Sequence, residues 1–377
     1  GIIQFRQAYG FQRVLQQANN KKDLKVNNKQ HNGGNSKPVR AEIPLLKMEK
    51  PGKIAVIGAG SWGTALAVLL GEKGCKVSLW VRRKELAEDI NKKRENRQYL
   101  KDIRIPASVT ATHSMKDAVE NCSMAVFAVP SEFLRHTANS FSGFIDKEVI
   151  VIHVAKGIEE NTGKLMSKVL EEELPQAKSI AVLSGPNHAK EVALKLPTAT
   201  VVASENKNVR ESVAKVFSTP YFKTYPHDDI KGVEICGAIK NIVAIAIGVC
   251  DGLKLGDNAK ASILTLGLSE MSIIARKFGA KRETCYGLAG VGDLVATCYS
   301  EHSRNRFVGE ELAKGKSIGQ ISREMHGMIA EGVKNTKAVC HLCRNNGLET
   351  PLISHVHKVL YQGTDLKEAI GHLLDII

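Results

Sequence analysis

Short apolar runs of four to six residues recur between residues 53 and 183, and stretches with helical spacing separate most of them. Their length and composition are typical of buried strands, and they lie at 53–57, 76–80, 124–129, 149–154 and 180–183. Because strands that alternate with helices usually form parallel sheets, this region is predicted to be a doubly wound, mostly parallel α/β sheet. In such sheets, ligands bind beyond the carboxyl ends of the strands.

The pattern changes near Asp228 and Asp229, beyond which long apolar stretches with helical spacing replace the strands. Two of these stretches, at 234–249 and 259–278, predict long helices. No apolar run is expected to reach the roughly 18–20 residues that a membrane span needs, so an integral membrane protein is excluded. The predicted organisation has three parts, a leader at 1–47, an α/β domain at 48–229 and an all-helical C-terminal domain at 230–377.

Residues 1–47 are dominated by Gln, Asn and Lys. Such a segment buries too little apolar surface to offset the entropy of ordering, so we expect disorder, with a weak helix at 3–17. Its basic, acid-poor composition fits an organelle transit peptide, which would place the protein in a plastid. The alternative is a dispensable extension ahead of Met48, where a cytoplasmic protein would start.

The charge of the chain is uneven. Lys and Arg number 53 against 39 Asp and Glu, a net charge of +14, and half of this excess lies in the first 50 residues. The rest of the chain is only mildly basic, which suits an anionic small molecule at least as well as a polynucleotide. Aromatic residues make up 5% of the chain, too few for a base-stacking surface, so nucleic acid is not the expected partner. Eight irregularly spaced cysteines indicate reduced thiols.

A glycine-rich turn follows the first predicted strand and leads into an apolar helical stretch. Its residues are Gly58, Ala59, Gly60, Ser61, Trp62 and Gly63. Gly58 permits the tight turn, Gly60 lets the backbone approach a pyrophosphate, and Gly63 lets the helix pack close to the strand. The start of the helix supplies amide donors and partial positive charge for phosphate. Strand, turn and helix together predict a Rossmann-type dinucleotide-binding domain at 48–229.

The residues after the second strand bear on the choice of dinucleotide. An NAD site usually has Asp or Glu there, about twenty residues past the fingerprint, to bind the ribose hydroxyls. This chain has Arg82 and Arg83. An arginine binds a 2′-phosphate through two donors, whereas a carboxylate repels it, so NADP(H) is favoured over NAD(H). Glu85 lies within reach of the ribose and leaves NADH open.

Lys240 lies in the first of the long apolar helices, with apolar neighbours nearly all round it. A buried lysine costs several kcal/mol and usually has a lowered pKa, which suits proton transfer near neutral pH. The alternative is a lysine whose stem lies on the helix while its ammonium reaches solvent.

Seven ordered blocks give the chain a close resemblance to a known family. They lie at 58–65, 155–157, 183–191, 237–241, 290–294, 303–306 and 331–332. On these blocks the chain, from about residue 53 to 374, is similar to the NAD(P)-dependent glycerol-3-phosphate dehydrogenases of bacterial and plastid type. The resemblance implies a reversible hydride transfer between NAD(P)H and dihydroxyacetone phosphate, giving sn-glycerol 3-phosphate, a precursor of glycerophospholipids. It also implies that 230–377 is a substrate domain.

The resemblance assigns roles to residues. Lys240 is implied as the catalytic proton donor and acceptor at the C2 oxygen of the substrate. The implied substrate-binding residues are Lys156, Gly185, Asn187, Lys240, Asp293, Ser303, Arg304 and Asn305. The implied cofactor-binding residues are Gly58, Gly60, Ser61, Trp62, Gly63, Arg82, Lys156, Ala189, Arg304, Ile329 and Glu331. Asn187 departs from the Thr or Ser expected at its position, which leaves its reach in question. Arg304 offers a planar donor fork that suits a phosphate.

Two other functions remain as alternatives. A related β-hydroxyacid dehydrogenase would have the same two domains but no need of a phosphate site at 303–305. A non-catalytic basic binding protein would not explain the sites for base, cofactor and phosphate together. A zinc site at Cys340 and Cys343 is not expected, because the downstream histidines have the wrong spacing. Apolar positions at 261–275 favour a homodimer.

Overall fold

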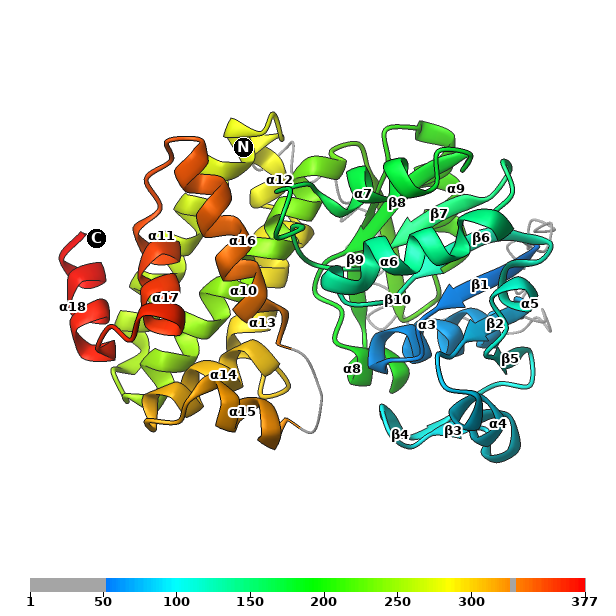
Figure 1. Ribbon diagram of the computed structural model, residues 1–377, viewed down its shortest axis with the longest axis horizontal. Helices are drawn as coiled ribbons and strands as arrows, with labels where there is room; N and C mark the ends of the chain where they lie inside the picture. Colours follow the sequence, from blue (N-terminus) through cyan, green and yellow to red (C-terminus); the bar gives the residue numbers. More distant parts are fainter. Residues whose placement is uncertain (1–51, 326–329, 377) are drawn as a thin grey trace, which may run out of the picture. The chain divides into compact units, whose positions relative to one another are not determined.

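The computed structural model describes residues 52–325 and 330–376. The leader at 1–47 and the weak helix at 3–17 lie outside these residues. Among the described residues, all strands lie before residue 228, where helices alternate with most of them, and only helices follow (Figure 1).

Eight strands form one sheet in the order β10-β9-β8-β7-β6-β1-β2-β5. The strands are β1 (Lys53–Ile57), β2 (Val77–Trp80), β5 (Val109–Thr112), β6 (Cys122–Phe127), β7 (Ile150–His153), β8 (Ser179–Ser184), β9 (Thr198–Ala203) and β10 (Phe222–His227). All neighbouring strands run parallel except β8 and β9, which are antiparallel. The predicted mostly parallel sheet and its five strands are confirmed, and β5, β9 and β10 are additional.

Helices cover both faces of this sheet. They are α3 (Ser61–Glu72), α4 (Lys84–Lys93), α5 (Met115–Val119), α6 (Ser131–Phe141), the short η1 (Ser142–Phe144), α7 (Met166–Glu173), α8 (Ala189–Ala193) and α9 (Lys207–Phe217). Strand β1 shows why two layers form, because its side chains alternate between faces. Ile54 and Val56 belong to one apolar cluster, and Ala55 and Ile57 belong to the other.

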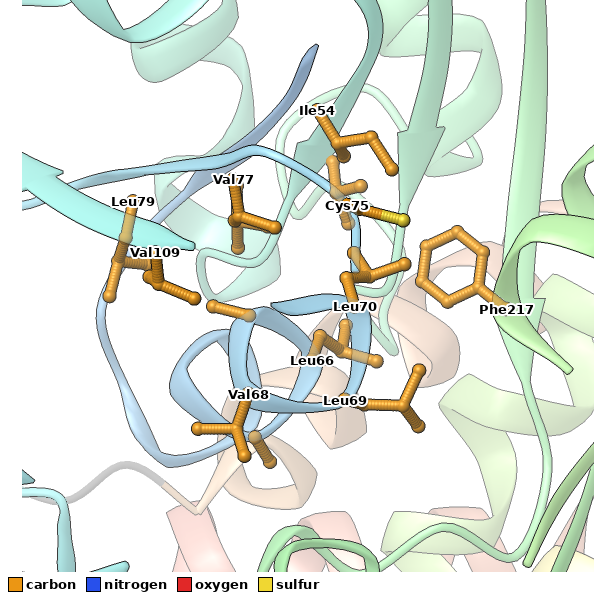
Figure 2. Close-up of a cluster of buried hydrophobic side chains, with 14 of the residues drawn as sticks. Ile54, Leu66, Val68, Leu69, Leu70, Cys75, Val77, Leu79, Val109 and Phe217 are labelled. Carbon is orange, nitrogen blue, oxygen red and sulfur yellow. The ribbon is translucent and has the colours of Figure 1, made fainter. Parts of the chain in front are cut away.

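Figure 2 shows the cluster on the face covered by α3. Leu66, Leu69 and Leu70 of this helix lie against side chains of the sheet. Phe217, at the end of α9, joins the same cluster and is fully buried. Burial on this scale holds α3 in place, and with it the glycine-rich turn at its start. A small antiparallel hairpin, β3 (Glu95–Asn96) and β4 (Leu100–Arg104), follows α4.

The helical region is built around α10 (Ile230–Gly252). The other elements are α11 (Gly256–Lys277), α12 (Arg282–Cys285), the π-helical turn η2 (Leu288–Gly292), α13 (Asp293–Tyr299), α14 (Arg304–Ala313), α15 (Ile318–Glu324), α16 (Glu331–Asn345), α17 (Pro351–Gln362) and α18 (Leu366–Ile376). Two glycines let α10 and α14 approach closely. A Cβ on Gly248 would lie 2.0 Å from the carbonyl oxygen of Arg306, and one on Gly309 would lie 2.0 Å from that of Ile245.

Helix α10 differs from the expectation that no apolar run approaches the length of a membrane span. Among the described residues it is long and apolar enough to cross a bilayer by length and composition. Every residue of its most apolar 18-residue window is buried inside the fold. Its place at the centre of the helical region therefore accounts for its apolarity.

The change from strands to helices falls between His227, where β10 ends, and Ile230, where α10 begins. Asp229 caps α10 by accepting a hydrogen bond from the N–H of Gly232 at 2.9 Å. Its other carboxylate oxygen accepts from the N–H of Lys281 and the hydroxyl of Thr284. The domain boundary at 229/230 itself stays a prediction.

Candidate active site

One buried carboxylate lies between two lysines. The Nζ of Lys240, in the middle of α10, donates to Oδ1 of Asp293 at 2.5 Å and to the hydroxyl of Thr297 at 2.6 Å. The Nζ of Lys156 donates to Oδ2 of the same Asp293 at 2.7 Å. Lys240 and Asp293 are 5% and 2% exposed. The ammonium of Lys240 thus lies inside the fold and does not extend into solvent.

The local fold explains how Asp293 reaches this position. It is the first residue of α13, where the positive end of the helix favours a carboxylate. The preceding turn needs glycine, because a Cβ on Gly290 would lie 2.0 Å from the carbonyl oxygen of Cys285. Thr297, one turn later in α13, faces the same lysine.

Burial and charge together set the protonation of this group. Burial lowers the pKa of Lys240 to about 8, Asp293 opposes this shift, and Lys156 reinforces it. For Asp293, burial alone would raise the pKa, but the two ammonium groups outweigh burial and lower it. The arrangement therefore holds an ionised Asp293 beside a lysine that gains and loses a proton near neutral pH.

The loop after β8 completes the surroundings of Lys156. The Nζ of Lys156 lies 3.2 Å from the carbonyl oxygen of Gly185 and 3.2 Å from Oδ1 of Asn187, and it donates to both. The amide of Asn187 in turn donates to the hydroxyl of Thr200 at 3.2 Å. Gly185 has φ +141°, which favours glycine, and a Cβ there would lie 2.9 Å from the same hydroxyl. The unexpected Asn187 thus reaches Lys156.

The three predicted phosphate residues lie at the start of α14 in different surroundings. Ser303 caps the helix by accepting from the N–H of Arg306 at 3.3 Å. The side chain of Arg304 is exposed. Asn305 is buried, and its amide donates to Asn241 at 2.9 Å and accepts from the N–H of Gly332 at 2.9 Å. Its side chain therefore joins three helices, which leaves its main-chain N–H as the group suited to an anion.

The glycine-rich turn has the shape that a dinucleotide needs. Gly58 has φ +114°, and a Cβ there would lie 2.6 Å from the carbonyl oxygen of Ala128. A Cβ on Gly63 would lie 1.9 Å from the carbonyl oxygen of Gly58, whereas one on Gly60 would meet nothing within 4 Å. Open space over Gly60 at a helix start fits a pyrophosphate. Beside it, Nε1 of Trp62 is buried without a hydrogen-bond partner among the described residues.

The hairpin of β3 and β4 braces this turn, which the fingerprint does not reveal. Asn96 is fully buried, and its Nδ2 donates to the carbonyl oxygen of Ala59 and to the hydroxyl of Thr64, both at 2.9 Å. The hydroxyl of Ser61 donates to the carbonyl oxygen of Tyr99 at 2.7 Å. Asn96 lies in a short polar segment with no periodicity, so no local signal marks it.

The other predicted cofactor residues are placed as follows. Arg82 follows β2 and is exposed, and its neighbour Arg83 donates to Gln98. Ala189 is the first residue of α8 and packs against the cluster that contains Leu66. Ile329 lies outside the described residues.

Glu331 is the first residue of α16. Burial raises its pKa, while the charges of Arg304, Lys156 and Lys240 oppose the rise. This coupling places Glu331 within electrostatic reach of both lysines. Arg304, at the start of α14, acts on the same carboxyl group.

Two further residues border the lysine pair. Thr297 follows Asp293 by four residues, and its hydroxyl lies 3.1 Å from Oδ1 of that aspartate, so helical spacing was a signal for it. His188 has its Nε2 3.3 Å from the carbonyl oxygen of Ala296. Burial lowers the pKa of His188, with Lys240 and Lys156 reinforcing the shift. His188 lies inside a block quoted for the resemblance, but its type alone points to no role.

Comparison with known proteins agrees with this geometry. Residues 53–210 match the family model of the N-terminus of NAD-dependent glycerol-3-phosphate dehydrogenase, and residues 229–371 match that of the C-terminus. The glycerol-3-phosphate dehydrogenase (NAD(P)+) of Chlorobium limicola is 47% identical over 323 residues, covering 85% of this chain and 97% of its own length. Its counterpart in Clostridium perfringens is 44% identical over 323 residues, with coverage of 86% and 97%.

Solved structures give the same result. The glycerol-3-phosphate dehydrogenase of Coxiella burnetii is 38% identical, with a TM-score of 0.83 and coverage of 86% of this chain and 99% of that one. A ketopantoate reductase from Ralstonia eutropha, 16% identical with a TM-score of 0.55, covers 85% of this chain and 99% of its own and shares the fold alone. The chain belongs to the NAD-dependent glycerol-3-phosphate dehydrogenase family.

Proposed function

We propose that the protein catalyses reversible hydride transfer between NAD(P)H and dihydroxyacetone phosphate, giving sn-glycerol 3-phosphate. The observation that carries the proposal is Lys240, buried between Asp293 and Thr297 with a pKa of about 8. Such a group donates a proton in one direction and accepts it in the other near neutral pH. The relatives' names support both the cofactor class and the substrate.

Each residue of the site has a role in this chemistry. The bound nicotinamide supplies or accepts the hydride. As negative charge grows on the C2 oxygen of the ketone, the ammonium of Lys240 stabilises it and then delivers the proton. Asp293 holds the ammonium groups of Lys240 and Lys156 at fixed positions, so no reorganisation is needed during the step.

The start of α14 is proposed as the phosphate site. The main-chain N–H groups of Arg304 and Asn305 lie in its first turn, where an α-helix leaves donors unpaired and the dipole favours an anion. The guanidinium of Arg304 adds a donor fork. Ser303 caps the turn, which fixes the direction of these donors.

Four further assignments are proposed with the function, and they concern the cofactor, the domain boundary, the oligomeric state and the location. Arg82 at the end of β2 supports NADPH over NADH, although exposed Glu85 lies nearby. The boundary at 229/230, where α10 begins, is proposed to separate cofactor and substrate domains. Apolar positions at 261–275 of α11 support a homodimer. The bacterial relatives support a cytoplasmic location, with a plastid as the alternative.

The test is oxidation of NADPH and NADH by dihydroxyacetone phosphate, followed for wild type, Lys240→Ala and Lys231→Ala. Loss of the proton donor is expected to lower kcat about 10³-fold. Lys231 lies on the same helix, near its start, and its replacement is expected to change kcat less than about twofold. A wild type inactive with both cofactors would overturn the proposed activity. An unchanged kcat in Lys240→Ala would overturn the role of Lys240 alone.

The pH dependence follows from the same lysine. Reduction of the ketone needs protonated Lys240, so its kcat/KM is expected to fall as pH rises through about 8. Oxidation of the alcohol needs the neutral amine, so its kcat/KM is expected to rise over the same range. Initial rates of reduction and of oxidation between pH 6 and 10 measure the two pH profiles. If both rates fell or both rose with pH, the assignment of Lys240 as proton donor and acceptor would be contradicted.

A further inference from the structure

Helix α16 reaches from the helical region to the loop that carries Lys156. Asn335 is 2% exposed, and its Nδ2 donates to the carbonyl oxygen of Lys156 at 2.7 Å. The N–H of Val154 still donates to the carbonyl oxygen of Phe127 in β6, but residues 155–157 lie in neither a helix nor a strand. A side-chain donor from another element therefore helps to set where the backbone of Lys156 lies.

The packing around this bond leaves little freedom. A Cβ on Gly157 would lie 2.6 Å from Oδ1 of Asn335 and 2.4 Å from the hydroxyl of Ser131. The amide oxygen of Asn335 thus lies close to Gly157, while its Nδ2 donates to the carbonyl oxygen of Lys156. The opposite orientation of the amide would bring its oxygen against that carbonyl oxygen, which is unfavourable.

The contacts on either side of Asn335 are weaker. Lys334 pairs with Glu132, and Lys337 pairs with Glu160 at 2.7 Å. Both lysines are more than half exposed, and exposed pairs contribute little because water screens them. The buried amide is therefore the directional contact between α16 and this loop.

Lys156 is thus held at both ends. Asn335 holds its carbonyl, and Asp293 together with the loop of Gly185 and Asn187 holds its ammonium. Because Asp293 also binds Lys240, a displacement of Lys156 changes the surroundings of the proposed proton donor.

We propose that Asn335 is a positioning residue for the reaction, which fixes Lys156 from the helical region. The inference rests on the proposed function, because it concerns the lysine pair of that site. Asn335 binds the main-chain carbonyl of Lys156 and not the ammonium group of Lys156 or of Lys240. Its effect on the reaction therefore passes through the backbone of the loop. The residue acts on the rate of the chemical step and not on the glycine-rich turn that binds the dinucleotide.

The test compares Asn335→Ala and Asn335→Asp with Asn346→Ala as the matched control. The aspartate keeps the shape of Asn335 but replaces a donor with an acceptor facing the carbonyl of Lys156. The amide of Asn346 also donates to a backbone carbonyl on α16, that of Leu342 at 2.9 Å, within its own helix. All variants are assayed with NADPH and dihydroxyacetone phosphate at a temperature where circular dichroism shows a folded protein.

Both Asn335 variants are expected to lower kcat about 10- to 100-fold, as a displacement of about 1 Å does, with KM for NADPH within about twofold. The pH at which kcat/KM for reduction falls is expected to shift in both Asn335 variants, because Lys156 contributes to the lowered pKa of Lys240. Asn346→Ala is expected to keep the wild-type kcat and pH profile. If the Asn335 variants lost only thermal stability and kept the kcat and pH profile of this control, the positioning role would be overturned. A wild type inactive with both NADPH and NADH would overturn the proposed function and this inference with it. An active wild type with unaffected Asn335 variants would overturn the inference alone.

Discussion

The α/β region and the helical region contribute to the site in different ways. The α/β region offers backbone in the turn from Gly58 to Gly63, and it adds the side chains of Lys156 and Asn187 from the loops after β7 and β8. The helical region offers buried side chains, Lys240 and Asp293, from two helices that meet by packing. The first kind of site is local in the sequence, and the second exists only in the folded chain.

The two kinds of site also differ in what stabilises them. In the turn, close approach of backbone excludes a Cβ at Gly58 and at Gly63, so glycine itself is the requirement at these two positions. Between Lys240 and Asp293, two charges are taken out of water, and Asp293 stays ionised because the ammonium groups of Lys156 and Lys240 outweigh its burial. A change in the turn is therefore expected to act on cofactor binding, and a change in the charge group is expected to act on the chemical step.

The largest effect is expected for Asp293→Asn. It removes the partner of two buried ammonium groups, and breaking one buried pair costs about 3–5 kcal/mol. We expect kcat to fall about 10³-fold, a change of about 4 kcal/mol. The pKa of Lys240 is expected to fall below 8, because Asp293 is the group that raises it, so the reduction limb moves to lower pH. Initial rates against pH measure both effects.

Asp251→Asn is the matched control for this change. Asp251 lies in the same helix as Lys240 and also bridges two cations, with Lys260 at 3.0 Å and Arg306 at 2.6 Å. Its loss is expected to lower stability with kcat within about threefold. Equal losses of kcat in both variants would mean that any bridging carboxylate matters equally, which contradicts a special role for Asp293.

The strands and long helices could be predicted because their signals are local. The five predicted strands and α10 and α11 follow from runs and periods within a few residues. Strand β9 is not predicted although Thr198–Ala203 carries apolar residues, because the helix before it, α8, has only five residues and shows no helical period between two strands. Strand β3 has two residues, which is too few for any period to show.

The site divides in the same way. The glycines of the turn could be predicted because their spacing is typical of a dinucleotide-binding turn. Lys240 could be predicted because it is a lysine within an apolar helix. The asparagines that hold these parts together could not be predicted from the sequence. Asn96, Asn305 and Asn335 each bind an element distant in sequence, so their roles depend on packing that no local pattern contains.

A smaller effect is expected when the turn itself is changed, with Gly63→Ala set against Gly60→Ala. A Cβ on Gly63 overlaps the carbonyl oxygen of Gly58, so α3 has to shift and the thermal midpoint is expected to drop by several degrees. A Cβ on Gly60 meets no protein atom, so stability is kept while space for a pyrophosphate is lost. KM for NADPH is expected to rise about 100-fold in both.

Gly143→Ala, at a glycine with open space outside the turn, controls for the added methyl group. Its kinetics and stability are expected to match wild type. If Gly60→Ala also kept the wild-type KM for NADPH, the turn would not be the pyrophosphate site. The contrast between the turn, which acts through its backbone, and the helical region, which acts through side chains, would then fail.

The smallest effect is expected for Arg82→Ala, which asks whether the α/β region also selects the dinucleotide through a side chain. Arg82 is exposed, so its contact with a 2′-phosphate would be partly screened and worth about 1.4 kcal/mol, or tenfold in KM for NADPH. KM for NADH is expected to stay within twofold, because NADH has no phosphate there. Lys84→Ala, an exposed cation two residues later that pairs with Glu88, is the control. Equal changes for both cofactors would mean that Arg82 supports the loop and does not select the dinucleotide. A selective change would show that the α/β region selects its dinucleotide with a side chain at the surface, whereas the chemical step depends on the buried group of Lys240, Asp293 and Lys156.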